Sequence, residues 1–341
     1  MSHWKIACLP FMRVVLLMFT LRALTGCGGG GSAPTTSTVP AVSAPGRFVL
    51  FSSNRAGGAG DYDVYLYDRQ SQSFVTLPGI NTSDSDFAAG LSQDARLVLF
   101  FRGGVTAFSS PQVFLYDRQN QSMVDLPGLN QVDMGQAATC ISPEGRYIVF
   151  NFIRRETTSD GFRIDVDVRL YDRQTQSLVP LPGLNSTSFE GEASISGDGR
   201  FIAFQSNRPG GVGLDDIYLY DRQTQSLVPL PGLNSSAGDA VPAISRDGRF
   251  IAFTSNRPGG AGSTDIYMYD RQTQSLVPLP GLNTVNSEGD PSFSSDGRLL
   301  AFDRTTPDGN IDVFLYDLQA HTTVPLPGIN SPNDDLVPRI N

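Results

Sequence analysis

Tyr269-Asp270-Arg271-Gln272 is the stretch that decides the fold, because it recurs along the whole chain. Its aspartate stands at positions 68, 117, 172, 221 and 270, and an altered copy, Tyr316-Asp317-Leu318-Gln319, follows. The period is therefore roughly 50 residues, and a fixed period of this size is the signature of a repeat architecture. Each copy is expected to be one small structural unit that depends on its neighbours for burial.

One repeat, from Val241 to Asn283, contains four short apolar segments that we predict to be strands. Asp247-Gly248 separates the first two and predicts a tight hairpin turn, because glycine tolerates the positive φ that such turns need. Two prolines in the fourth segment place it at an outer edge, since proline cannot donate to a sheet ladder. The four predicted strands are Val241–Ser245, Arg249–Phe253, Ile266–Tyr269 and Leu276–Pro280.

Four antiparallel strands that are apolar on both faces describe the blade of a β-propeller, because each blade buries its faces against its neighbours. Six copies predict an all-β, six-bladed β-propeller of four-stranded antiparallel blades over residues 40–341. A β-solenoid and a tandem array of small β-domains are the alternatives. The first strand occurs seven times, since Pro40–Ser43 and Val337–Asn341 both match it. If the C-terminal copy is used, both ends of the chain close the ring.

The segment Ser245–Phe253, followed by Asn256-Arg257 and Asp265-Ile266-Tyr267, resembles the TolB-type propeller repeat, a relative of WD-type repeats. The resemblance covers nearly all of residues 40–341. One departure is Ile244, which stands where that family often has tryptophan. TolB also carries a separate α/β domain before its propeller, and residues 27–39 leave no room for one. The resemblance therefore implies a TolB-like propeller that is not TolB itself.

Residues 1–26 read as an export signal, because basic Lys5 and Arg13 are followed by a short apolar run at Val14–Thr20. Leu24-Thr25-Gly26-Cys27 resembles the bacterial lipobox, which implies an N-terminal lipid on Cys27. An ordinary cleaved signal is the alternative. Residues 27–39 are rich in glycine and predict a flexible tether. We expect an exported, lipid-anchored protein of the periplasm or cell surface, with the outer membrane favoured because the residue after Cys27 is not aspartate.

Composition excludes several classes of function. The net charge of −9 and the single lysine argue against nucleic acid binding, which needs a basic surface. Beyond the predicted signal the chain has one histidine, His321, which is too few for a histidine-based metal site or a catalytic triad. We therefore expect no enzyme, with a carboxylate-based hydrolase as a remote alternative. Cys140 would then be the one thiol left after lipidation, so no internal disulfide is expected.

Candidate binding residues lie on the face that carries the loops between blades and the loops between second and third strands. An acid precedes most inner strands, with Gln136 as the exception, and an arginine follows each second strand. A ring of carboxylates at the channel mouth would suit a cation or a basic peptide. The alternative is that each acid pairs with a neighbouring arginine. The candidates are Asp86, Glu192, Asp239, Asp290, Asp335, Arg208 and Arg257.

The least repeated loops on this face are Val105–Pro111, Arg155–Asp165 and Thr305–Asn310. Loops on a rigid scaffold are where recognition usually occurs. We therefore predict a monomeric, non-catalytic scaffold that binds another envelope protein and reaches the membrane through its lipid. No cofactor is expected, and Ca²⁺ bound in the channel is the alternative. The alternative is a cation-dependent binder of a cell-wall polymer or small ligand at the acidic mouth.

Overall fold

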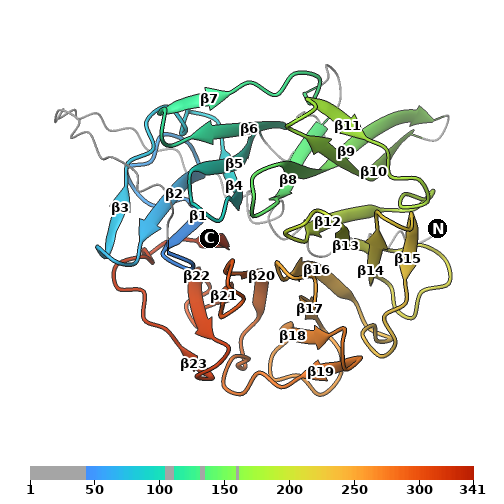
Figure 1. Ribbon diagram of the computed structural model, residues 1–341. Coiled ribbons are helices and arrows are strands. Elements are labelled where there is room, and N and C mark those ends of the chain that lie inside the picture. The colour runs from blue at the N-terminus through green and yellow to red at the C-terminus, as the bar shows by residue number, and fades with distance from the viewer. Residues whose placement is uncertain (1–43, 104–110, 131–134, 159–160) are drawn as a thin grey trace.

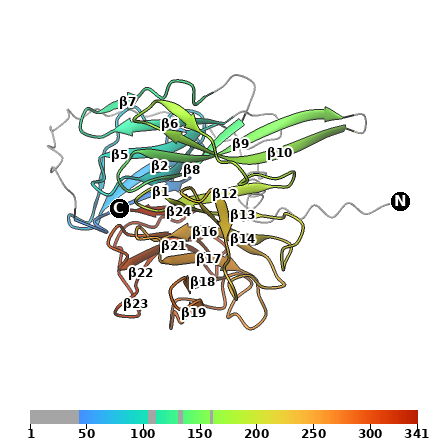
Figure 2. The ribbon, with the colours of Figure 1, turned by 45° about the vertical axis from the view of Figure 1, so that its right-hand side comes forward.

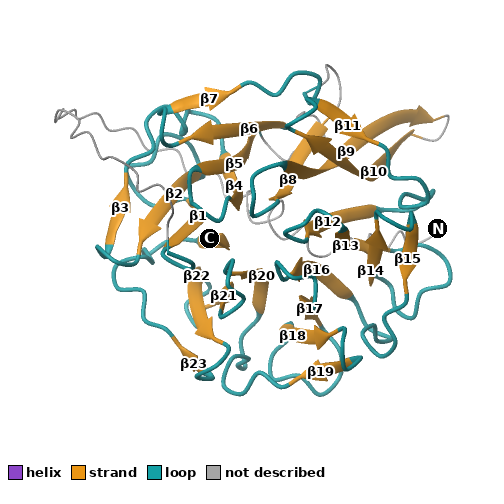
Figure 3. Ribbon diagram, in the orientation of Figure 1, coloured by secondary structure: helices purple, strands orange, loops and turns teal. Residues whose placement is uncertain are grey.

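The computed structural model describes residues 44–103, 111–130, 135–158 and 161–341, and the regular structure in these residues is strand (Figure 3). Six four-stranded antiparallel sheets follow one another around a ring (Figure 1). The prediction of a six-bladed β-propeller is confirmed. The predicted signal, the tether and Pro40–Ser43 lie outside the described residues. Within the described ranges no helix is long and apolar enough to cross a membrane.

The strands of each blade are given in order from the inner strand to the outer strand. Blade one consists of β24 (Asp335–Ile340), β1 (Phe48–Ser53), β2 (Asp63–Asp68) and β3 (Ser73–Val75). Blade two consists of β4 (Asp86–Leu91), β5 (Leu97–Arg102), β6 (Gln112–Asp117) and β7 (Ser122–Val124). Blade three consists of β8 (Gly135–Ile141), β9 (Tyr147–Thr158), β10 (Gly161–Asp172) and β11 (Ser177–Val179).

The remaining three blades repeat this order. Blade four consists of β12 (Glu190–Ile195), β13 (Phe201–Ser206), β14 (Asp216–Asp221) and β15 (Ser226–Val228). Blade five consists of β16 (Asp239–Ile244), β17 (Phe250–Ser255), β18 (Asp265–Asp270) and β19 (Ser275–Val277). Blade six consists of β20 (Glu288–Phe293), β21 (Leu299–Thr305), β22 (Ile311–Asp317) and β23 (Thr322–Thr323).

The C-terminal strand closes the ring. β24 pairs antiparallel with β1, with Val49 opposite Ile340, and both lie near the C-terminus in Figure 2. The backbone N–H of Phe48 donates to the Asn341 side chain at 2.7 Å, and that of Gly46 donates to the Asn341 carbonyl at 2.6 Å. The seventh copy of the first strand, at the C-terminus, is therefore the inner strand of blade one.

The tyrosine of the repeated motif joins neighbouring blades. Tyr269 is fully buried, and its hydroxyl donates to the carbonyl of Pro231 in the preceding blade at 2.9 Å. The same bond recurs in five blades, and the equivalent Tyr116 hydroxyl finds no partner among the described residues. This contact explains why the motif repeats at the blade period. The other pairs are Tyr67–Pro327, Tyr171–Pro127, Tyr220–Pro182 and Tyr316–Pro280.

The aspartate and arginine of the motif fasten the turns on one face. Asp270 accepts the Gln272 N–H at 2.9 Å and pairs with Arg249 at 2.7 Å, and this hydrogen bond to Arg249 lowers the pKa of Asp270 to about 2. Arg271 donates to the carbonyl of Gly248 in the hairpin turn. Gly248 has φ of 72°, which explains the glycine. The equivalent ion pair occurs once in every blade.

The outer strand is shorter than predicted. β19 ends at Val277, so Pro278 and Pro280 follow the strand instead of lying within it. Both prolines belong to the connection that leads to the next blade. At the end of this connection Asn283 bonds both the N–H and the carbonyl of Ile266, at 3.0 and 2.8 Å. This side chain takes the place of a strand neighbour for the half of β18 that β19 does not pair with.

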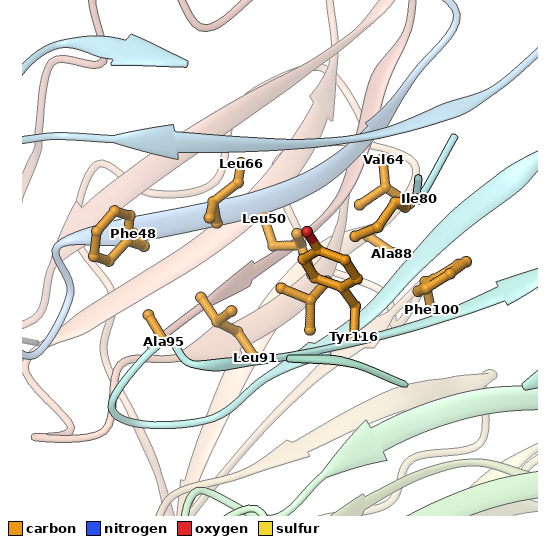
Figure 4. Packing of buried hydrophobic residues seen from close by; sticks show 11 residues of the cluster. Phe48, Leu50, Val64, Leu66, Ile80, Ala88, Leu91, Ala95, Phe100 and Tyr116 are labelled. Carbon is orange, nitrogen blue, oxygen red and sulfur yellow. The ribbon is translucent and has the colours of Figure 1, made fainter. Parts of the chain in front are cut away.

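The hydrophobic core lies between blades. In Figure 4, Phe48 and Leu66 of blade one face Ala95, Leu91 and Tyr116 of blade two. Equivalent clusters fill the spaces between the other neighbouring blades. A single blade could not bury these side chains alone, so ring closure and burial depend on each other.

Candidate functional site

Three of the predicted acids are buried and paired. Asp86, Asp239 and Asp335 begin inner strands β4, β16 and β24, and their side chains have no exposed surface. For these three acids the structure shows the second predicted arrangement, in which each acid pairs with a neighbouring arginine. Their partners are Arg102 at 2.7 Å, Arg257 at 2.7 Å and Arg55 at 2.6 Å.

Sequence analysis missed two members of this set. Glu190 and Glu288 begin β12 and β20 and pair with Arg208 at 3.2 Å and Arg304 at 2.7 Å. The sequence-based candidates Glu192 and Asp290 stand two residues later and occupy a different position in the strand. The signal was present, because residues 190, 239 and 288 are equally spaced. The predicted candidates Arg208 and Arg257 are thus engaged in buried ion pairs.

Blade three departs from this pattern. Gln136 is opposite Phe152 in the β8–β9 register, as Glu190 is opposite Ser206, but its side chain is outside what the structure describes. Arg154 pairs instead with Asp165 at 2.5 Å and Asp167 at 3.2 Å on the neighbouring strand. These charges therefore stabilise the long β9–β10 hairpin, which projects from the ring in Figure 2.

A bulge in the inner strands turns other side chains toward the axis. Glu192 and Asp290 have φ of 48° and 47°, and the strand register shifts beside them. Such bulges re-aim side chains, and they commonly lie near functional sites. Both residues line the central channel, together with Arg339 of β24 and Asn151 of β9. Of the predicted candidates, the structure therefore brings only Glu192 and Asp290 together in this cavity.

A third carboxyl group reaches the same place from a second strand. Asp303 of β21 accepts the Val337 N–H at 3.1 Å and is hydrogen-bonded to Asp290. Burial raises the pKa of Asp303 well above its usual value, and the nearby Asp290 raises it further. Burial also raises the pKa of Asp290, and it raises that of Glu192 to about 7. We infer that Asp290 and Asp303 share a proton at neutral pH.

These raised pKa values predict a loss of stability as the pH rises from 6 to 8. The folded protein keeps protons that the unfolded chain has already released, so ionisation at higher pH penalises the folded state. Asp303→Asn should remove part of this dependence, on the order of 1–2 kcal/mol of unfolding free energy. Gln205, a neutral amide at the matching position, already accepts the Val241 N–H at 3.4 Å.

Denaturant unfolding at both pH values would measure the effect. The control is Asp84→Asn, which changes an exposed acid of the loop before β4. Equal pH dependence in Asp303→Asn and in the wild type would contradict the shared-proton description.

A second hollow forms the mouth of the channel. It is lined by Tyr62, Leu214 and Asp215, and by Asp290 and Asp303. Val241, Asp290 and Val337 line the mouth and the channel alike, so the two spaces share a wall. Among the described residues, the mouth is lined by acids, neutral polar side chains and apolar side chains, with no arginine or lysine.

Two other chemically reactive side chains are a thiol and an imidazole. Cys140 carries a free thiol on the channel wall, and burial raises its pKa. His321 lies in the outer turn before β23, with its ring nitrogen 3.4 Å from the Tyr316 hydroxyl. In the described ranges no three His, Cys, Asp or Glu side chains are grouped so that they could hold a metal ion.

No protein-family model matches the sequence, and no curated protein matches it. Among solved structures, TolB from Acinetobacter baumannii is similar with a TM-score of 0.62 and 18% identity over 86% of this chain. The match spans 66% of that protein, which is slightly less than two thirds of its length. A putative TolB from Agrobacterium tumefaciens has a TM-score of 0.51 and 17% identity, with 83% of this chain and 89% of that chain covered.

An oligogalacturonate lyase in complex with manganese is also similar, with a TM-score of 0.55 and 16% identity over 82% of this chain and 73% of its own. Identities this low establish the fold alone, and the similar structures include an enzyme. The chain is a six-bladed β-propeller similar in fold to TolB, which confirms at the level of the fold the resemblance carried by its repeats.

Proposed function

We propose that this chain is a monomeric, non-catalytic propeller that binds another protein of the bacterial envelope through its loop face. The loop face is the side on which the inner strands begin and the loops between second and third strands lie. The observation that carries the proposal is the distribution of exposed apolar side chains, which differs between repeated and non-repeated positions.

Eight large apolar side chains are exposed in the described part of the chain. Four occupy one repeated position on the outer strands, so the blade pattern accounts for them: Phe74, Met123, Leu178 and Leu276. The other four do not repeat: Ile164 (47% exposed) lies near the start of β10, and the loop-face connections carry Val212 (64%), Leu214 (70%) and Val285 (86%). Non-repeated apolar groups on one face of a rigid scaffold are what recognition of a partner requires.

The loop that carries Val212 and Leu214 is held in place. The Asp216 carboxylate accepts the N–H of Val212 at 2.8 Å and that of Gly213 at 3.1 Å. Gly211 is required here, because a Cβ at this position would collide with the same carboxylate. A loop that is ordered before binding loses little conformational entropy when a partner docks.

Paired charges and the position of His321 support a non-catalytic role. Arg208 and Arg257 form ion pairs with buried acids, and His321 lies at the outer rim. A propeller fold is compatible with enzymes as well as with binding proteins, so the fold itself does not decide. The proposal depends on the chemistry that these side chains offer.

The repeats themselves supply a test of the loop face. Blade five has Ala261 and Ser263 where blade four has Val212 and Leu214. The connection that leads into blade five has Ser236 where the connection into blade six has Val285. The triple variant Val212→Ala, Leu214→Ser, Val285→Ser therefore uses residues that the fold already accepts. It should keep the wild-type melting temperature and lose at least about tenfold in partner affinity.

The matched control is Leu276→Thr, which removes an exposed apolar side chain from the outer rim and copies Thr323 of blade six. Quantitative affinity capture from the producing cell would compare the three proteins. The loop-face proposal fails if the triple variant retains its partner while Leu276→Thr loses it.

We also propose that a lipid on Cys27 tethers the propeller to the outer membrane after export. The support is the segment Leu24–Cys27, which resembles a lipobox, and the glycine-rich residues 28–31 that follow. Cys27→Ser should release the protein from the membrane fraction, whereas the control Cys140→Ser should leave it there. Fractionation with metabolic fatty-acid labelling measures both outcomes. Retention of unlabelled Cys27→Ser protein in the membrane would overturn the proposed anchor.

A further inference from the structure

The central channel contains opposite charges that do not pair with each other. Glu192 and Asp290 face the cavity that Arg339 also lines, and Arg339 influences the ionisation of both. Nevertheless, no ion pair within 4 Å joins Arg339 to a carboxylate in the described residues. Arg339 uses Nε and Nη1 for the carbonyls of Ala89 and Pro338, both at 3.0 Å. Its Nη2 is left for another acceptor.

A buried amide on the same wall has unmet hydrogen-bonding capacity. Asn151 is 1% exposed, and neither its Nδ2 nor its Oδ1 has a partner in the structure. At the matching positions Gln205 and Asp303 accept an N–H from the bulge of the next blade. Asn151 correspondingly faces the bulge that carries Glu192. A buried amide that leaves both groups unsatisfied costs free energy unless something else fills them.

The described acids are not grouped to hold a metal ion, and the cavity has room for a small molecule. The cavity has about 170 Å³ of water-accessible space. Metal coordination by oxygen needs ligands converging within about 2.6 Å of one point, and the described acids form no such group. A ligand that spans the cavity with two charges of opposite sign would satisfy both walls.

We propose that the channel binds a small zwitterion, a molecule with an ammonium group and a carboxylate separated by a short aliphatic chain. The ammonium group would donate to Glu192, Asn151 Oδ1 and Asp290. The carboxylate would accept from Arg339 Nη2. At the mouth, Asp215 and the Asp290–Asp303 pair would attract its cationic end, and Leu214 borders that opening.

Calorimetric titration of the full chain, purified as its host produces it, tests the site. The probes are β-alanine and γ-aminobutyrate, with n-butylamine and butyrate as analogues that carry one charge each. We expect at least one zwitterion to bind, and both single-charge analogues to bind at least about tenfold more weakly because each leaves one wall unpaired. Binding should strengthen from pH 6 to pH 8 as Glu192 loses its proton.

Glu192→Gln keeps the shape of the site and should weaken zwitterion binding about tenfold or more, with the pH dependence lost. Arg339→Lys should retain more zwitterion affinity than Arg339→Met. This comparison distinguishes the contribution of the positive charge from that of side-chain packing. Asp84→Asn, an exposed acid outside the cavity, should bind as the wild type does.

Three results would overturn the proposal. The first is no heat of binding from either zwitterion at millimolar concentration, which would mean that the cavity holds water only. The second is butylamine binding as well as the zwitterions, which would remove Arg339 from the site. The third is calcium chloride displacing the zwitterion while Glu192→Gln leaves zwitterion affinity unchanged, which would assign the acids to a metal.

Discussion

Deletion of residues 336–341 should abolish the cooperative folding of the propeller at ordinary temperature. The deletion removes nearly all of β24, which pairs with β1 and buries Leu336 and Ile340. It also removes Asn341, whose side chain and carbonyl accept backbone N–H groups at 2.7 and 2.6 Å. The sum of lost apolar burial and hydrogen bonds is at least about 5 kcal/mol, comparable with the whole stability of a typical domain.

Circular dichroism and differential scanning calorimetry would measure the loss. The matched control is a deletion of six residues, 28–33, in the predicted tether, which should melt as the full chain does. If the C-terminal deletion also melts at the wild-type temperature, another segment fills the inner position of blade one. Pro40–Ser43 would then be the candidate, since it matches the same strand in sequence.

Loss of a buried counter-ion should have the next largest effect. Arg257→Met leaves Asp239, which has no exposed surface, without its cation and leaves the Leu233 carbonyl without a donor. We expect a loss of about 3–5 kcal/mol in unfolding free energy, because an uncompensated buried charge is costly. Adding Asp239→Asn should recover a large part of it, since the amide removes the charge and can still accept the Ser235 N–H.

The control for this cycle is Arg246→Met. Arg246 pairs with Glu144 on the opposite face, where both side chains are more than a third exposed, and its removal should cost less than about 1 kcal/mol. Denaturant unfolding of the wild type, Arg257→Met, Asp239→Asn and the double variant gives the coupling energy. Equal losses in Arg257→Met and Arg246→Met would show that the loop-face acids do not depend on their arginines.

The fold could be predicted from the sequence because the same residue types make the same contacts in every blade. Tyr269 reaches the preceding blade, Asp270 fixes a turn, and Asn283 covers the third strand, so each constraint appears at the repeat period. Which terminus closes the ring could not be predicted. Both termini carry the same strand pattern, and the structure distinguishes them through the pairing of β24 with β1 and the bonds made by Asn341.

The channel residues were predicted less well. Acids at the strand start and acids in the bulge stand two residues apart and look alike in sequence. Their surroundings differ, because one kind is buried in an ion pair and the other lines the cavity. Asp239 is buried against Arg257, whereas Glu192 faces the cavity. The positive φ of Glu192 decides its direction, and no local sequence signal for that conformation exists at a glutamate. Arg339 and Asn151 were missed because they are distant in sequence and differ from their repeat equivalents.

The central claim is that recognition takes place where the repeat is broken, and site-specific photo-crosslinking tests it most directly. A photo-reactive amino acid would replace Leu214 on the loop face in one protein and Leu276 on the outer rim in another. Both side chains are exposed, at 70% and 37%. In the producing cell, position 214 should crosslink to a discrete partner protein and position 276 should not. A discrete adduct at position 276, with none at position 214, would contradict the account.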